Sequence, residues 1–203
     1  MDSKNILSKR DLILSTARDI ITKQGYAKTT LEDIANALGM KKSSLYYYYQ
    51  NKDALLEDVI KNEKEKYIFL ITEALSKEEK IVDKLINYEI TKSNYVKSVM
   101  KLQDLSINIF IELKHKIFKV AKEIRESEVS LLTKVIEESI KKKEIKKCNA
   151  AKIAQILPTI SEAFRHREIY FCQFEPDKQI DFTKANEDIA FTIKLIFDGL
   201  LIK

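Results

Sequence analysis

Residues 25–56 decide the fold, and they read GYAKTTLEDIANALGMKKSSLYYYYQNKDALL. Between Leu31 and Leu38 the apolar residues recur at three- and four-residue steps, which is the spacing of one buried helix face. Gly39 readily ends a helix, and the next helix is expected over 42–48. Two short helices joined by a glycine-containing turn predict a helix-turn-helix, whose second helix enters the major groove of DNA.

The residues before this motif complete a three-helix head. A helix is expected over 5–24, because the apolar residues there form one stripe. Thr30 followed by Asp33 is typical of a capping box at the start of the next helix. We therefore predict a helix-turn-helix DNA-binding domain over 1–50 and an effector-binding and dimerisation domain over 51–203.

The composition favours an all-α protein throughout. The 203 residues include three glycines and two prolines, too few for the turns that sheets and long loops need. Helix-forming residues dominate instead, and about nine helices are expected. After the head these cover residues 51–76, 79–96, 98–113, 116–143, 149–173 and 183–202.

Positive charge is concentrated in the head. The formal net charge is +5, and residues 1–52 hold nine Lys and Arg against five Asp and Glu, a difference of +4. A basic head suits a polyanion such as DNA, although a solvated lysine-rich surface would give the same count.

The motif resembles the head of the TetR/AcrR bacterial transcriptional regulators. Members show T-T-x-x-x-I-A-x-x-x-G, then a short helix ending in L-Y-x-x-F, then K-x-x-L. The matching residues are Thr29, Thr30, Ile34, Ala35, Gly39, Leu45, Tyr46, Lys52 and Leu55. The resemblance implies an all-α fold with an N-terminal three-helix head and a C-terminal helical domain for ligand binding and dimerisation. Beyond the head, the chain is similar to the family only in length and helical character.

The resemblance also implies a DNA-facing surface. Phosphate contacts, which fix register without reading sequence, are expected from Thr30, Tyr46, Tyr47 and Lys52. The start of the recognition helix enters the groove, so the candidates for base contacts are Lys41, Lys42, Ser43 and Ser44. Tyr48 fits either role, and a half-buried aromatic face is the alternative reading for the tyrosines.

Two residues depart from the family pattern. Lys41 stands where a Ser or Thr often caps the recognition helix, so Ser43 and Ser44 could cap one turn later, or Lys41 could face phosphate. Tyr49 stands where Phe is usual, and we expect it to point inward with its hydroxyl on water or a partner.

The body is expected to form a homodimer and to bind a small molecule. The resemblance implies pairing through the last two helices, and 183–202 is apolar on more than one face. It also implies an effector pocket, for which we single out Tyr88, Phe110 and Phe118, although core packing is the more common role of such aromatics. Low charge near residues 106–113 favours an apolar or aromatic effector.

Other classes of function find little support in the sequence. No catalytic constellation, cofactor motif or metal-ligand spacing occurs, so we expect no enzyme, cofactor or metal. No signal or transmembrane segment is evident, which predicts a cytoplasmic protein that is not in a membrane. Cys148 and Cys172 could form a redox switch, with Lys146 and Lys147 lowering the pKa of Cys148, but two reduced thiols are the simpler reading.

The prediction for function is a ligand-released repressor that binds a palindromic double-stranded operator as a homodimer. A transcriptional activator is one alternative, because the position of the operator and not the protein sequence decides between activation and repression. A helical interaction protein without specific DNA binding is another.

Overall fold

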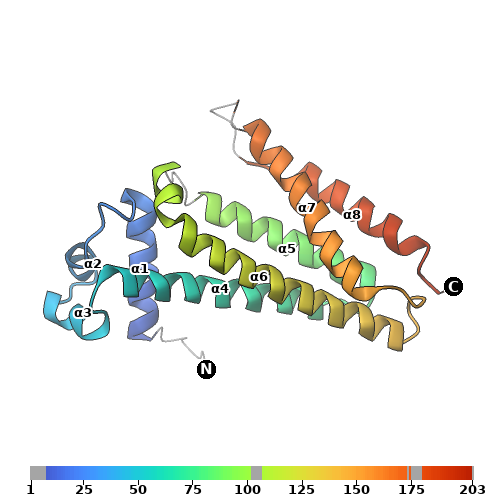
Figure 1. The fold of residues 1–203 in the computed structure, drawn as a ribbon, viewed down its shortest axis with the longest axis horizontal. Coiled ribbons are helices and arrows are strands. Elements are labelled where there is room, and N and C mark those ends of the chain that lie inside the picture. The colour runs from blue at the N-terminus through green and yellow to red at the C-terminus, as the bar shows by residue number, and fades with distance from the viewer. Residues whose placement is uncertain (1–7, 102–106, 173, 175–179, 203) are drawn as a thin grey trace, which may run out of the picture. The chain divides into compact units, whose positions relative to one another are not determined.

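The computed structural model describes residues 8–101, 107–172, 174 and 180–202. Within these residues the chain is all α-helical, as predicted, and forms no strand. Figure 1 shows the eight helices, which are α1 (Lys9–Gln24), α2 (Leu31–Ala37), α3 (Lys42–Tyr48), α4 (Lys52–Ser76), α5 (Ile81–Lys101), α6 (Ile107–Lys141), α7 (Ala150–Cys172) and α8 (Thr183–Asp198).

The prediction of separate helices over 98–113 and 116–143 is wrong. Helix α5 continues to Lys101, and α6 runs from Ile107 to Lys141 without a break at 114–115. No glycine or proline occurs between residues 40 and 157, so the sequence carries no local signal for the boundary. The predicted helix over 42–48 matches α3 at both ends.

The first compact unit comprises residues 1–66 and 100–121. Helix α1 begins at a capping box in which Ser8 Oγ accepts from the Asp11 amide. It ends at Gly25, where φ is 91°, a conformation that favours glycine. The unit's core is formed by residues Ile13, Leu14, Ala17, Leu31, Ile34, Ala35, Leu45, Tyr49, Leu55 and Val59.

The second compact unit comprises residues 67–99 and 122–203. Helix α7 packs against α8, as Figure 1 shows. Its core is formed by Tyr67, Ile71, Leu75, Ile81, Leu85, Tyr88, Leu132, Ile136, Ile145, Ala150, Ala154, Leu157, Ile189, Ile193 and Phe197. An isolated antiparallel bridge joins Ile145 to Leu201 after α8.

These units are defined by compactness, whereas the predicted boundary after residue 50 concerns function and stays a prediction. None of the helices in the described part of the chain is long and apolar enough to cross a membrane.

Candidate DNA-binding surface

Thr30 starts α2 through the predicted capping box. Its Oγ1 accepts a hydrogen bond from the Asp33 amide at 3.1 Å, and Asp33 Oδ2 accepts from the Thr30 amide at 2.8 Å. The Thr30 hydroxyl and the Thr30 amide both donate to Asp33 Oδ2, and these two bonds lower the pKa of Asp33. Thr29 beside it is buried and donates to the Gly25 carbonyl at 2.7 Å. The two threonines therefore fix the turn before α2, and Thr30 itself stays exposed.

Gly39 and Leu45 set how α3 follows α2. Gly39 adopts φ +62°, which lets the chain reverse within a short turn. Leu45 is fully buried and anchors α3 in the core. Lys41 occupies the N-cap position and makes no side-chain capping bond. With Lys42 and Ser43 it is exposed, while Ser44 is half-buried.

The tyrosine run divides as predicted, with one ring inside and three outside. Tyr49 is 8% exposed and belongs to the core of the first unit. Tyr46, Tyr47 and Tyr48 are 44%, 87% and 41% exposed. The rings of Tyr47 and Tyr48 meet edge to face, with centroids 5.6 Å apart. The three exposed rings therefore form an aromatic patch on α3, in the same short helix as Lys42 and close in sequence to Lys41.

Lys42 is tied to α2 by an exposed ion pair. Its Nζ lies 2.9 Å from Glu32 Oε2, and this bond raises the pKa of Lys42. Because both side chains are more than half exposed, the pair contributes little to stability. Glu32 was not among the residues singled out from the sequence, because a single acid on an amphipathic helix gives no distinctive signal.

Lys52 is bound to the turn between α1 and α2. Its Nζ donates to the Tyr26 carbonyl at 2.7 Å and lies 4.2 Å from the centroid of the Tyr26 ring. A second bond reaches the Ala27 carbonyl at 3.3 Å. Lys52 is half-buried and joins the start of α4 to the turn between α1 and α2. Its contact with a DNA phosphate stays a prediction.

A three-residue cluster supports the far end of α3. The Tyr49 hydroxyl donates to Asp58 Oδ2 of α4, and Arg10 of α1 donates to the same carboxylate from Nε at 3.0 Å. The departure from the family pattern at Tyr49 predicted that its hydroxyl would contact water or a partner. It did not indicate Asp58 or Arg10, which are distant from Tyr49 in the sequence.

The helix-turn-helix region corresponds to a known protein family. Residues 13–59 match the family model described as bacterial regulatory proteins, tetR family. Residues 13–59 therefore carry a DNA-binding head of the TetR family. The matched residues contain α2, α3, the start of α4 and the core that holds them.

The TetR-family head also aligns with a named relative. The biofilm operon icaADBC HTH-type negative transcriptional regulator IcaR of Staphylococcus epidermidis is 38% identical over 53 residues. This alignment covers 26% of the chain and 29% of that relative's length.

Solved structures share the TetR-family fold over nearly the whole chain. A transcriptional regulator from Cytophaga hutchinsonii covers 95% of this chain and 98% of its own, with a TM-score of 0.70 and 24% identity. A candidate TetR-family regulator from Mesorhizobium loti covers 95% and 96%, with a TM-score of 0.74 and 14% identity. The family and these proteins are regulators and not enzymes, in agreement with the prediction.

The aromatic residues proposed for an effector site lie in different settings. Tyr88 is fully buried in the second unit, where its hydroxyl donates to Glu128 Oε1 at 2.9 Å. Phe118 lies in the first unit and is 73% exposed. The side chain of Phe110 lies outside the described ones. Tyr88 is therefore the candidate with a buried polar contact, and the ligand role of all three stays a prediction.

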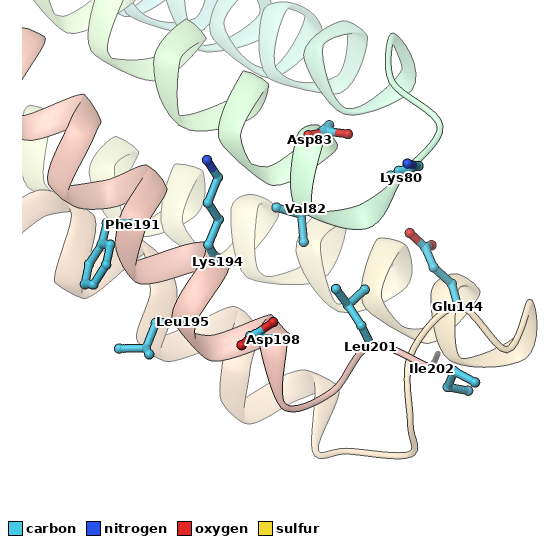
Figure 2. Close-up of a pocket in the computed structure, with 10 residues that line it drawn as sticks. All are labelled: Lys80, Val82, Asp83, Glu144, Phe191, Lys194, Leu195, Asp198, Leu201 and Ile202. Carbon is cyan, nitrogen blue, oxygen red and sulfur yellow. The ribbon is translucent and has the colours of Figure 1, made fainter.

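A groove of about 880 Å³ opens in the second unit between the start of α5, α8 and the residues after α8. Figure 2 shows Val82 of α5 and Leu201 pointing toward one another across it. Most of its surface is apolar, and charged side chains of both signs surround it. Of the predicted effector residues whose side chains are described, neither Tyr88 nor Phe118 lines this groove.

The lowered pKa considered for Cys148 is not found in the structure. Cys148 and Cys172 are not joined in a disulfide, and both are half-buried. Burial raises the pKa of the Cys148 thiol, so the prediction that Lys146 and Lys147 lower it is wrong. A thiol with a raised pKa is less reactive at neutral pH.

Proposed function

We propose that the chain is a transcriptional repressor that binds a double-stranded, palindromic operator as a homodimer and leaves it when a small-molecule effector binds. The observation that carries the proposal is the surface of α3, where exposed lysines adjoin three exposed tyrosines on a helix held by buried Leu45 and Tyr49. Lysines and tyrosine hydroxyls are common phosphate ligands, and the start of such a helix reads base edges. A regulator of this kind acts in the cytoplasm, where the DNA lies.

The proposed homodimer pairs the last two helices, α7 and α8, with their copies. Helix α8 exposes Phe191 and Leu195, which are 68% and 66% exposed. Helix α7 exposes Ile156 and Tyr170, at 40% and 57%. Large exposed apolar side chains on packed neighbouring helices are typical of an interface. A two-fold interface must also be self-complementary, and the groove beside Phe191 carries both lysines and acids.

Repression is supported by the relative's name, because IcaR is a negative transcriptional regulator. Because the resemblance to this relative is confined to the head, activation remains the alternative. Whether a regulator activates or represses depends on where its operator lies relative to the promoter. Release by an effector requires a ligand that prefers the state that does not bind DNA.

The proposal is tested by selection of duplexes from a random-sequence pool with the full chain. We expect the enriched sequences to contain an inverted repeat, because a two-fold dimer presents two recognition helices. Failure to enrich any sequence would favour a helical interaction protein without specific DNA binding. Placing the enriched site over a promoter in a reporter then distinguishes repression from activation.

A further inference from the structure

An ion pair joins the two helices of the helix-turn-helix. Helices α2 and α3 pack against one another (Figure 1), and Lys42 Nζ at the start of α3 donates to Glu32 Oε2 in the first turn of α2 at 2.9 Å. The side chains of Lys42 and Glu32 are 54% and 58% exposed. Both charged ends are therefore accessible to a molecule that approaches this surface.

Glu32 is the acid of this turn that α2 does not use for its own cap. The first turn of α2 contains Glu32 and Asp33, and Asp33 Oδ2 accepts from the amide and the hydroxyl of Thr30 at 2.8 Å each. Asp33 is therefore committed to the start of the helix. The carboxylate of Glu32 is instead directed toward α3, where it meets Lys42.

The pair keeps unused hydrogen-bonding capacity on both sides. The bond to Glu32 raises the pKa of Lys42, so the ammonium group retains its three protons at neutral pH. With Glu32 as its partner among the described residues, Lys42 can offer two of these protons to another acceptor. An ionised carboxylate accepts about four hydrogen bonds, so Glu32 can also accept from a further donor.

The pair matches the major-groove edge of a G·C base pair. That edge presents guanine N7 and O6 as acceptors and the cytosine N4 amino group as a donor. Guanine O6 and cytosine N4 share a Watson–Crick hydrogen bond, so their separation is about 2.9 Å. Lys42 Nζ and Glu32 Oε2 are also 2.9 Å apart. Lys42 can therefore donate to O6 and N7 of guanine while Glu32 accepts from N4 of cytosine.

The other three base pairs fit this arrangement less well. In the same orientation, C·G and A·T place an amino donor opposite Lys42 and a carbonyl acceptor opposite Glu32, so both contacts are unfavourable. T·A places O4 opposite Lys42 and the N6 amino group opposite Glu32, which restores two bonds. It also places the thymine methyl group beside the ammonium and the N7 acceptor beside the carboxylate. G·C is therefore the best match and T·A the second.

We propose that Lys42 and Glu32 together read one G·C base pair in each half of the operator, with Lys42 on guanine and Glu32 on cytosine. This inference rests on the proposed function, in which the start of α3 enters the major groove. It adds a residue of α2 to the recognition surface and assigns a base pair to it. Glu32 is then a residue that determines specificity.

A solvated ion pair without a role in recognition predicts a different behaviour. An acid near the phosphates opposes the binding of every duplex, so its removal would raise all affinities by one factor. An acid that accepts from cytosine contributes only where that base is present, so its removal changes the preference at one position. Dependence on position therefore separates the two roles of Glu32.

Selection from a random duplex pool with the full chain, repeated with Glu32→Ala and Lys42→Ala, tests the proposal. Both side chains are exposed and alanine suits a helix, so the variants should fold. We expect the parent to enrich G·C at one position of each half-site. Both variants should lose that preference at the same position and keep the others. Glu65→Ala is the matched control, since Glu65 is 59% exposed and ion-paired to Lys61 on α4, and it should select as the parent does.

Affinities for duplexes that differ only at this position measure the contact. We expect the parent to prefer G·C over C·G and A·T by about tenfold, with T·A between them. Glu32→Ala and Lys42→Ala should each reduce this preference. The two substitutions combined should reduce it by less than the product of their separate effects, because both residues contact one base pair.

The outcomes separate this inference from the proposed function. If the parent enriches no sequence, the proposed function fails and this inference fails with it. If the parent enriches an operator but Glu32→Ala keeps every preference, or binds all duplexes more tightly by one factor, this inference alone fails. Loss of preference at different positions in the two variants would also overturn it, because the residues would then not share a base pair.

Discussion

The Tyr49 hydroxyl donates a hydrogen bond to Asp58 Oδ2 at 2.5 Å. Tyr49 is the residue directly after α3, and Asp58 lies in the second turn of α4. Burial and the bond to Asp58 raise the pKa of Tyr49, so its hydroxyl keeps the proton that it donates. Arg10 of α1 binds the same carboxylate, so the end of α3 is joined to α4 directly and to α1 through Asp58.

Replacing Tyr49 with Phe should weaken this junction without disturbing the core. The ring stays buried, while Asp58 loses one hydrogen bond, so we expect Tyr49→Phe to lower the free energy of unfolding by about 1 kcal/mol. Urea unfolding followed by circular dichroism measures the change. Tyr47→Phe is the control, because Tyr47 is 87% exposed, and it should leave stability unchanged. A similar stability for both variants would show that the Tyr49 bond contributes nothing.

The contribution of Asp58 should disappear in acid. Burial raises the pKa of Asp58, but the bonds from Arg10 and Tyr49 outweigh burial and lower it below the ordinary aspartate value. A lowered pKa in the folded state adds stability above the unfolded-state pKa, and this stability is lost as the pH falls through the folded-state pKa. Asp58→Asn should therefore be less stable than the parent at neutral pH. The difference should vanish at low pH, where an unchanged difference would exclude this origin.

The head could be predicted from sequence because its signals are local. Thr30 with Asp33, Gly39, and the apolar spacing around Leu45 each act within a few residues, and the structure confirms the cap, the turn and the buried face. The inward position of Tyr49 could be predicted because consecutive helical residues point in different directions. The structure confirms it, since Tyr49 is buried. Its partner Asp58 was missed, since contacts between helices leave no trace in residue spacing.

The body could be predicted only as helical. Without glycine or proline between residues 40 and 157, the end of α5 and the start of α6 depend on tertiary packing. The buried charged side chains of the second unit were also missed, because residues such as Glu89 and Lys92 on an amphipathic helix usually face solvent. The pairing of Lys92 with Glu128 and of Arg165 with Glu89 offsets the cost of their burial.

Charges placed on the exposed face of α8 should separate the proposed dimer. Phe191→Glu combined with Leu195→Glu puts two acids into the expected interface, and their desolvation opposes association. Analytical ultracentrifugation should show the parent as a dimer and the variant as a monomer with unchanged helix content. Phe69→Glu alters a similarly exposed residue outside α7 and α8 and should remain dimeric. A dimer that survives the double substitution would place the interface elsewhere.

Removing a proposed DNA contact should weaken binding and spare the fold. Lys42→Ala and Tyr47→Ala change exposed side chains of α3, so each should cost about 1–3 kcal/mol of operator affinity with little change in unfolding free energy. Lys61→Ala, at an exposed position of α4, is the control and should bind as the parent does. Gel-shift titrations measure the three affinities. Full affinity in both α3 variants would remove this surface from the DNA interface.

Fluorescence anisotropy on the selected duplex tests the central claim most directly. The parent chain is titrated against that duplex and a scrambled one of equal length, at low and moderate salt. We predict binding to the selected duplex at least about a thousandfold tighter than to the scrambled one, with an affinity that falls as salt rises. Equal affinity for both duplexes, or no binding to either at low salt, would contradict the account of this chain as a sequence-specific DNA-binding regulator.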